Sequence, residues 1–464
     1  MIQIKSTVGV LYAVAGLDRA TFISLAAKFW SVGAGLLSLF FVSHYLSAEQ
    51  QGFYYTFYSL IALQIFVELG LGYAIIQFAS HEMIGLTWVD KNIALEGKPE
   101  NLARLQSILK FSTIWYGSAS LIILMVLIPV GTYFFTKSLA GKPIDFSVLL
   151  PWVFLVVVTA PAICLNAGLS ILEGCNKVAA VVEIRFIQSI CSVISVWCVL
   201  IAGGGLYSLA VGALMSVLIG VYCLHKNYAV FFRSLWAHEA VSQGISWRDE
   251  IWPFQWRIAV SWGSGYLIFQ IFNPLLLYYH GGVAAGQMGM SLQILMAMNG
   301  AAAVWISTKI PMFGQLAAAN QRELLNEVFF DALRRSLIFL VVGVFFVMVI
   351  LVNASHFLQQ FSGRILPINY FGVLMLIGVA NHVVFAQASY LRANKVEPFM
   401  ILSVVTGLAT TGLAFLLVPE YSYKGAVFAY AIGAIVVSLG GGSYIFSKLH
   451  SQWTEGSKFV RGNQ

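Results

Sequence analysis

The sequence predicts an all-α polytopic membrane protein, with about twelve transmembrane helices in two pseudo-symmetric six-helix bundles around a central cavity. Three observations predict this fold: the apolar segments, the one-sided distribution of positive charge, and similarities between the two halves of the chain. Of the 464 residues, 59% are hydrophobic and 10% are charged. This composition is far from that of a soluble domain.

Twelve apolar segments are each long enough to cross a bilayer, since about 20 apolar residues in a helix span the hydrocarbon core. The segments are the main evidence for the fold class, and their order defines the loops. They lie near residues 21–45, 52–80, 108–136, 148–172, 179–202, 205–224, 254–280, 286–312, 334–353, 366–392, 398–417 and 423–447.

Positive charge falls on one side of these spans. If the N-terminus is on the inner side, only four of the 26 lysines and arginines lie on the outer side. An excess of Lys and Arg marks cytoplasmic loops, so both termini are predicted to be cytoplasmic. The pI near 9.0 follows from this asymmetry and predicts no nucleic-acid partner. The four outer residues are Lys137, Lys142, Arg364 and Lys424.

The loops divide the chain. The outer loops are short, so none has room for a catalytic domain. Two inner segments, 101–111 and 315–335, are amphipathic, and they predict either helices lying in the inner interface or extensions of spans 3 and 9 into the cytoplasm. The longest break, 225–253, contains three tryptophans and is predicted to be a cytoplasmic linker. It separates an N-terminal bundle (1–224) from a C-terminal bundle and tail (254–464).

The two halves resemble each other at corresponding places. An even number of spans per half gives both halves the same orientation, as in transporters built from parallel repeats, whose sites lie between the repeats near mid-membrane. Duplication therefore predicts such a site here. The matching pairs are Ala48–Gly52 with Ala285–Gly289, Leu172–Val178 with Tyr390–Val396, and Arg19 with Arg257.

The sequence contains no motif for nucleotide, metal or hydrolytic chemistry. No G-x-x-x-x-G-K-[ST] or H-E-x-x-H occurs, and the five cysteines lack metal-ligand or disulfide spacing. The chain is therefore predicted not to be an enzyme and to need no cofactor or metal. Any transport must be driven by a sodium or proton gradient, the membrane potential or the substrate's own gradient.

Glu68 is the one acidic residue well inside a predicted span, about ten residues or roughly 15 Å from the inner end of span 2. A charge at this depth costs several kcal/mol unless it is paired or hydrated, which favours a functional role. That role is ion coupling or pairing with Lys28 in span 1. The alternative is a protonated or hydrogen-bonded carboxyl that fixes helix packing.

Four basic residues lie on the cytoplasmic side of spans 1, 7 and 8, and they are Arg19, Lys28, Arg257 and Lys309. Together they predict a cationic mouth able to bind a phosphate or pyrophosphate, Arg by a bidentate geometry and Lys as a point charge. The alternative is that they only satisfy the excess of positive charge on the inner side.

Three polar residues of the spans, Asn273, Asn299 and His382, are candidates for lining a sugar-binding cavity, and His382 could also relay a proton. Such side chains also join neighbouring helices by hydrogen bonds, and the sequence leaves both interpretations open.

The chain resembles the lipid-linked oligosaccharide flippases of the multidrug/oligosaccharidyl-lipid/polysaccharide exporter superfamily, which include bacterial polysaccharide and O-antigen exporters. The resemblance lies in Leu46–Tyr54, in Val67-Glu-Leu-Gly-Leu-Gly72 and in the Asn-Lys-Val loops after spans 4 and 10. It implies two bundles around a central cavity that opens alternately to the two sides. It also implies an undecaprenyl-diphosphate-linked oligosaccharide as substrate, carried across the bacterial inner membrane for surface polysaccharide assembly.

The resemblance further implies that a cationic cavity receives the diphosphate, and Lys28, Arg257 and Lys309 fit that role by their location. A polysaccharide polymerase and other assembly proteins are implied partners, beside membrane lipids. A cation-coupled multidrug antiporter of the same fold is the alternative function. Its members use membrane carboxylates to bind cations, whereas one deep carboxylate and several bases favour an anionic cargo.

Overall fold

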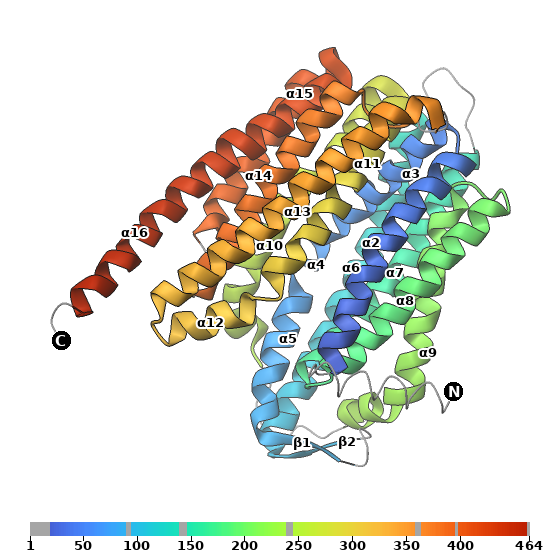
Figure 1. The fold of residues 1–464 in the computed structure, drawn as a ribbon. Coiled ribbons are helices and arrows are strands. Elements are labelled where there is room, and N and C mark those ends of the chain that lie inside the picture. Colours follow the sequence, from blue (N-terminus) through green and yellow to red (C-terminus); the bar gives the residue numbers. More distant parts are fainter. Residues whose placement is uncertain are drawn as a thin grey trace, which may run out of the picture. The chain divides into compact units, whose positions relative to one another are not determined.

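The computed structural model describes residues 19–89, 94–138, 146–237, 245–357, 363–394 and 398–461. Nearly all of the described chain is helical (Figure 1). Within the described residues, nine helical segments are long and apolar enough to cross a membrane, and a bent pair in span 2 raises the number to ten. The prediction of an all-α polytopic membrane protein is confirmed.

Two of these segments are long enough to cross twice. They run over 64 and 55 residues, Gln255–Ala318 and Phe399–Trp453. At 1.5 Å per residue a continuous 64-residue helix would measure roughly 96 Å, about three times the hydrocarbon core. The backbone turns out of the helical region at Gly281 (φ 80°) and Ser422 (φ 55°), inside two predicted outer loops. Ten segments therefore accommodate the twelve predicted crossings.

The helices form two compact units. Unit 1 contains residues 1–34 and 63–262, and unit 2 contains residues 35–62 and 263–464. The second part of span 1 and the first part of span 2 thus pack with the C-terminal half of the sequence. The chain passes between the units within α2 (Arg19–Tyr45), at the 3₁₀ turn η1 (Ala62–Gln64) and within α10 (Trp252–Phe269).

Unit 1 is built mainly from long helices and includes a small hairpin. Besides the parts of α2 and α10, it contains α4 (Ile65–Glu68), α5 (Leu71–Glu82), the 3₁₀ turn η2 (Met83–Gly85), β1 (Leu86–Val89), β2 (Ala94–Gly97), α6 (Pro99–Ser138), α7 (Phe146–Gly174), α8 (Val178–Ile201), α9 (Tyr207–Ala237) and a π-helical turn, η3 (Trp247–Ile251).

A close contact between α6 and α7 anchors the core of unit 1. Trp152 of α7 is fully buried, donates a hydrogen bond from its indole to the carbonyl of Leu127 (3.2 Å) and packs edge-on against Phe135. Gly131 leaves the space for the indole ring, since a side chain there would overlap it. This packing keeps α6 close to α7.

The hairpin β1–β2 was not predicted from the sequence. Its strands are antiparallel, with Leu86 opposite Gly97, and Figure 1 shows it at the end of unit 1 reached by α5. Trp88 fixes its position, because its indole donates to the carbonyl of Cys175 (2.8 Å) and its ring lies 4.9 Å from that of Phe231. The hairpin thus ties the α7–α8 connection to α9.

The structure decides between the two interpretations of the amphipathic segments. Residues 101–111 belong to the 40-residue helix α6, and residues from Arg322 onward belong to α13 (Arg322–Phe357). Residues 101–111 and 322–335 are therefore continuous with the helices of spans 3 and 9. A separate short helix, α12 (Ile310–Ala318), precedes α13. In the predicted linker, α9 continues to Ala237, and residues 238–244 lie outside the described chain.

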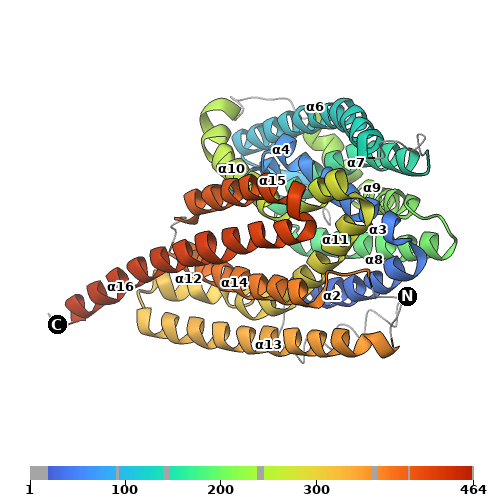
Figure 2. The ribbon, with the colours of Figure 1, turned by 90° about the horizontal axis from the view of Figure 1, so that it is seen from above.

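Unit 2 contains the remaining helices. They are α3 (Ala48–Ile61), α11 (Phe272–Ser307), α12, α13, α14 (Ile368–Ala393), α15 (Phe399–Ala431), a π-helical segment η5 (Ile432–Gly440) and α16 (Gly441–Arg461). In Figures 1 and 2, the C-terminal part of α16 extends beyond its neighbours within this unit.

The two copies of the repeated Ala–Gly motif pack against each other inside unit 2. Gly52 of α3 meets the backbone of Gly282 in α11, where any larger residue would collide. The Gln51 side-chain amide donates to the carbonyls of Gly286 and Arg364, at 2.8 Å each. Small residues allow helices in lipid to approach closely, which accounts for glycine at positions 52, 282 and 286.

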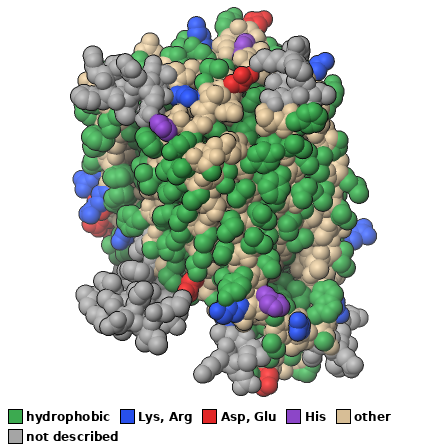
Figure 3. Space-filling view, turned by 90° about the vertical axis from the view of Figure 1, so that its right-hand side faces the viewer, with side chains coloured by type: hydrophobic (Ala, Val, Ile, Leu, Met, Phe, Trp, Pro, Cys, Tyr) green, Lys and Arg blue, Asp and Glu red, His purple; other side chains and the backbone are tan. Residues whose placement is uncertain are grey.

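The surface agrees with a membrane environment. Figure 3 shows one face on which hydrophobic side chains cover the centre, while charged side chains gather mostly toward the margins. Large apolar residues of several helices are exposed, among them Met125 of α6, Phe345 of α13 and Leu416 of α15. Such a surface suits contact with lipid.

Candidate functional site at the break in span 2

Span 2 is interrupted where the sequence predicts a continuous helix. The helix α4 ends after Glu68, and α5 begins at Leu71, with a bend of 45° between the two parts. Leu69 and Gly70 both have left-handed backbone conformations, with φ of 49° and 67°. A left-handed leucine costs about 1–2 kcal/mol, a strain that is characteristic of functional sites. We call Leu69 and Gly70 the span-2 break.

Packing against α10 requires glycine at the break. A Cβ on Gly70 would lie 2.5 Å from Cγ2 of Ile258, so no side chain fits there. Two residues further on, a Cβ on Gly72 would lie 3.2 Å from the hydroxyl oxygens of both Tyr116 and Ser170. The break is therefore enclosed by α6, α7 and α10 of unit 1, two of which present hydroxyl groups to it.

Glu68 is the last residue of α4 and directly precedes the break. Its side chain is half-buried, and no basic side chain of the described chain forms an ion pair with it, Lys28 included. The final carbonyl groups of a helix have no partners within it and form the negative end of its dipole. A carboxylate beside such carbonyls offers oxygen ligands to a sodium ion, or an acceptor for a proton. Transporters place their coupling ions at helix ends of this kind.

The predicted basic residues occupy different elements. Lys28 on α2 and Arg257 on α10 are exposed side chains of unit 1, and Lys309 is an exposed residue of unit 2 between α11 and α12. Arg257 directly precedes Ile258, the residue that packs on Gly70, and its guanidinium lies 5.8 Å from the ring of Trp256. The structure thus brings the helix of Arg257 to the break that follows Glu68.

The predicted polar residues all lie in unit 2, where two of them join helices. The amide of Asn273 is buried and donates to the hydroxyl of Ser59 on α3 at 3.2 Å. His382 is buried on α14, with Nε2 2.9 Å from the hydroxyl of Ser336 on α13. These contacts are those expected of packing between helices.

Asn299 differs from the other two, because its buried Oδ1 has no hydrogen-bond partner within the described chain. Asn273 also keeps its Oδ1 unpartnered there, although its amide nitrogen is bonded. Both acceptors are thus buried polar atoms without a partner in the described chain.

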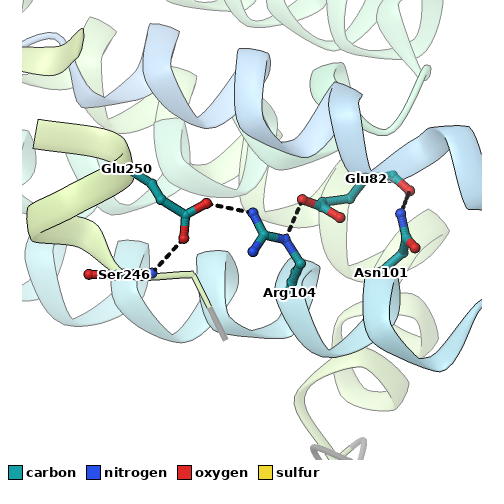
Figure 4. Close-up of polar contacts among 5 residues, drawn as sticks. All are labelled: Glu82, Asn101, Arg104, Ser246 and Glu250. Atoms are coloured by element: carbon teal, nitrogen blue, oxygen red, sulfur yellow. Dashed lines mark hydrogen bonds and ion pairs between the residues drawn. The ribbon is translucent and has the colours of Figure 1, made fainter. Parts of the chain in front are cut away.

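A charge cluster that sequence reasoning missed lies at one end of unit 1. Arg104 of α6 donates from Nε to Glu82 (2.8 Å) and from an Nη atom to Glu250 (2.7 Å), as Figure 4 shows. Asn101 donates to the carbonyl of Glu82, and the backbone N–H of Ser246 donates to Glu250. Arg104 and Glu250 are 146 positions apart in the sequence, so no local pattern could have revealed the cluster.

The cluster holds the π-helical turn Trp247–Ile251 on unit 1. The hydrogen bond from Arg104 holds the pKa of Glu250 below its usual value of 4.5. Trp247 adds apolar contact, because its ring stacks within 5.7 Å of Phe111 and its indole donates to Gln255. A cavity of about 390 Å³ opens beside the ion pairs and is also lined by His81.

The described residues include no group of three or more His, Cys, Asp or Glu side chains placed to hold a metal ion. A single carboxylate with backbone oxygens remains the basis for ion binding at the break.

Comparison of the structure with solved proteins identifies the fold. An inward-facing multidrug resistance MATE family transporter of the MOP superfamily aligns with a TM-score of 0.66 at 14% identity, covering 92% of this chain and 96% of that one. The fold is that of MOP superfamily transporters. The lipid II flippase MurJ, in an inward closed conformation, aligns with a TM-score of 0.65 at 13% identity, covering 92% and 87%.

An outward-facing MATE family transporter also aligns, with a TM-score of 0.56 at 14% identity and coverage of 94% and 96%. No family model matches the sequence, and no curated protein matches it closely. At these identities the comparisons establish the fold, which contains both drug transporters and a lipid flippase.

The Arg104 cluster leads to a first prediction. Arg104→Gln removes both ion pairs and leaves the buried carboxylate of Glu82 unpartnered, which costs about 1–3 kcal/mol. We expect amide hydrogen exchange of Trp247–Ile251 to rise by about 5–150-fold, measured by mass spectrometry on the purified protein. Arg248→Gln, in the same turn, is the control and leaves exchange unchanged. Unchanged protection in Arg104→Gln would contradict a role for the cluster in holding this turn.

The same experiment has a pH dependence. Because the pKa of Glu250 is lower in the folded state, its stabilising contribution is complete above about pH 4.5 and is lost as the pH falls through the folded-state pKa. We expect the protection of Trp247–Ile251 against exchange, corrected for the intrinsic exchange rate, to fall in that acidic range in the wild type. In Arg104→Gln we expect this loss of protection already at neutral pH.

Proposed function

We propose that the chain is a flippase that carries an undecaprenyl-diphosphate-linked oligosaccharide outward across the bacterial inner membrane by alternating access, for surface polysaccharide assembly. The proposal includes cytoplasmic termini and delivery of the units to a polysaccharide polymerase. The fold supports it, since this fold serves both a lipid II flippase and multidrug transporters.

The observation that carries the proposal is that α10, which bears Arg257 next to Ile258, packs against the span-2 break. Glu68 is a single half-buried acid, whereas Lys28 and Arg257 of the same unit are exposed bases. A diphosphate is a multiply charged anion, and guanidinium and ammonium groups are the side chains that bind it most strongly. An excess of bases therefore favours an anionic cargo over a cationic drug.

The remaining predicted residues complete the proposed path. Lys309 adds a third base, and the free Oδ1 atoms of Asn273 and Asn299 accept hydrogen bonds from sugar hydroxyls. His382 is bonded to Ser336, so we assign it to the wall of the path. The polyprenyl tail stays in the bilayer, because moving it through a polar cavity would expose its apolar surface.

Glu68 is proposed to couple an ion to the return of the empty carrier. A carboxylate inside a membrane span is costly when charged, and a proton or a sodium ion at the break removes that cost. The helix-end carbonyls before Leu69 supply further oxygen ligands for sodium. Neutralised Glu68 then lets the empty carrier reorient at a lower free-energy cost.

A cation-coupled multidrug antiporter is the second candidate function. The observation in its favour is that the neighbours include several MATE transporters beside MurJ. Glu68 would then bind the cationic drug or the coupling ion directly. The two functions predict different cargo in cells that lack the protein.

Deletion of the protein separates these functions. We expect a strain without it to accumulate a polyprenyl-diphosphate oligosaccharide that reagents outside the inner membrane cannot reach, and to lose a surface glycan. The measurement is lipid extraction with mass spectrometry, with plasmid-borne wild type as the control. Unchanged surface glycans together with new drug sensitivity would establish the antiporter instead, and accumulated units reachable from outside would indicate a polymerisation defect.

Substitution of Glu68 tests ion coupling. We expect Glu68→Gln to reduce delivery of the glycan by about tenfold, within the range of typical coupling free energies, and to abolish its dependence on pH and sodium. Glu100→Gln, an exposed acid at the start of α6, is the control and transports normally. Normal transport by Glu68→Gln across a range of pH and sodium concentrations would contradict a coupling role.

A further inference from the structure

A groove of about 760 Å³ lies in unit 2 where α11, α12 and α13 meet. Its charged lining comes from Lys309, Glu327, Asp331, Arg334 and Arg335, and Trp305 forms part of its apolar wall. We call it the α12–α13 groove. The predicted inner connection between spans 8 and 9 forms it, so it lies at the level of the cytoplasmic headgroups.

The walls of the groove are held by aromatic packing. Phe313 of α12 and Phe329 of α13 are fully buried, with ring centroids 6.0 Å apart, and Figure 2 shows α12 lying along α13. The ring of Trp305 lies 4.6 Å from that of Phe339. The groove is therefore preformed, and little binding free energy is lost to ordering its walls when a ligand binds.

The charges of the groove divide into a satisfied set and an unsatisfied pair. Asp331 accepts from Arg335 at 2.8 Å and from Arg334 at 3.3 Å. Lys309 and Glu327 form no ion pair with any described residue. The groove thus offers an exposed cation and an exposed anion that form no ion pair within the described chain, beside two arginines that pair with Asp331.

We propose that the α12–α13 groove binds the headgroup of a phosphatidylethanolamine molecule from the cytoplasmic leaflet. Lys309 and the arginines contact its phosphate, Glu327 accepts hydrogen bonds from its ammonium group, and the apolar wall around Trp305 takes the start of the acyl chains. This site is separate from the span-2 break, and it uses Lys309, which the proposed function also assigns to the path of the diphosphate.

Charge complementarity favours this lipid over others. Phosphatidylglycerol offers a phosphate to the bases of the groove, but its uncharged glycerol carries no cation for Glu327. Phosphatidylcholine matches the charges, but its quaternary ammonium has no N–H to donate to Glu327. A primary ammonium beside a phosphate satisfies both unpaired groups with charge-assisted hydrogen bonds.

Native mass spectrometry of the full-length protein, purified in detergent with equal amounts of phosphatidylethanolamine, phosphatidylglycerol and phosphatidylcholine, tests the site. We expect the wild type to retain phosphatidylethanolamine preferentially. Glu327→Gln lowers its ratio to phosphatidylglycerol by about tenfold, since a charged hydrogen bond is lost, and Lys309→Ala lowers retention of both.

The exposed residues Glu100 and Lys110 of α6 provide matched controls, and Glu100→Gln and Lys110→Ala leave the lipid ratio unchanged. A thermal unfolding midpoint equal to that of the wild type shows that each variant is folded. Equal retention of the three lipids by the wild type, a wild-type preference for phosphatidylglycerol, or an unchanged ratio in Glu327→Gln together with unchanged retention in Lys309→Ala would overturn the proposal.

Discussion

The contact of Gly70 with Ile258 is the interaction on which the proposed transport site depends. Hydrocarbon supplies no hydrogen-bond partners, so a helix crossing it is interrupted only where protein encloses the freed backbone groups. At the span-2 break that enclosure comes from α10, α6 and α7, and it requires glycine at position 70. The enclosure places Glu68 at a helix end, and it brings α10, which carries Arg257, against the same point.

The second half of the chain also interrupts its corresponding span, span 8. There α11 ends at Ser307 and α12 begins at Ile310, with Lys309 between them. The two breaks differ in their surroundings. The span-2 break directly follows an acid, Glu68, and is enclosed by helices, whereas the break at Lys309 adjoins a groove with charges of both signs. A duplicated architecture thus carries two distinct polar sites, each contained within one compact unit.

Much of the fold could be predicted from the sequence, because the lipid environment requires long apolar segments with polar ends. The same reasoning identified Glu68, since a lone deep acid stands out against an apolar span. The break after it could not be predicted, because Leu-Gly-Leu-Gly also fits a continuous membrane helix. The hairpin has four-residue strands without clear alternation, and the Arg104 cluster joins distant positions. Likewise, the assignment of residues 35–62 to unit 2 depends on long-range packing.

Reconstitution tests the flippase function most directly. Purified protein is inserted into liposomes that contain a polyprenyl-diphosphate oligosaccharide, and a glycosidase added outside reports the fraction of sugar exposed on the outer leaflet. We predict that the protein brings the protected inner-leaflet pool to the outside, at a rate that depends on the imposed sodium or proton gradient. Exposure no faster than in protein-free liposomes, combined with gradient-driven transport of a cationic drug by the same preparation, would contradict this function and establish the antiporter.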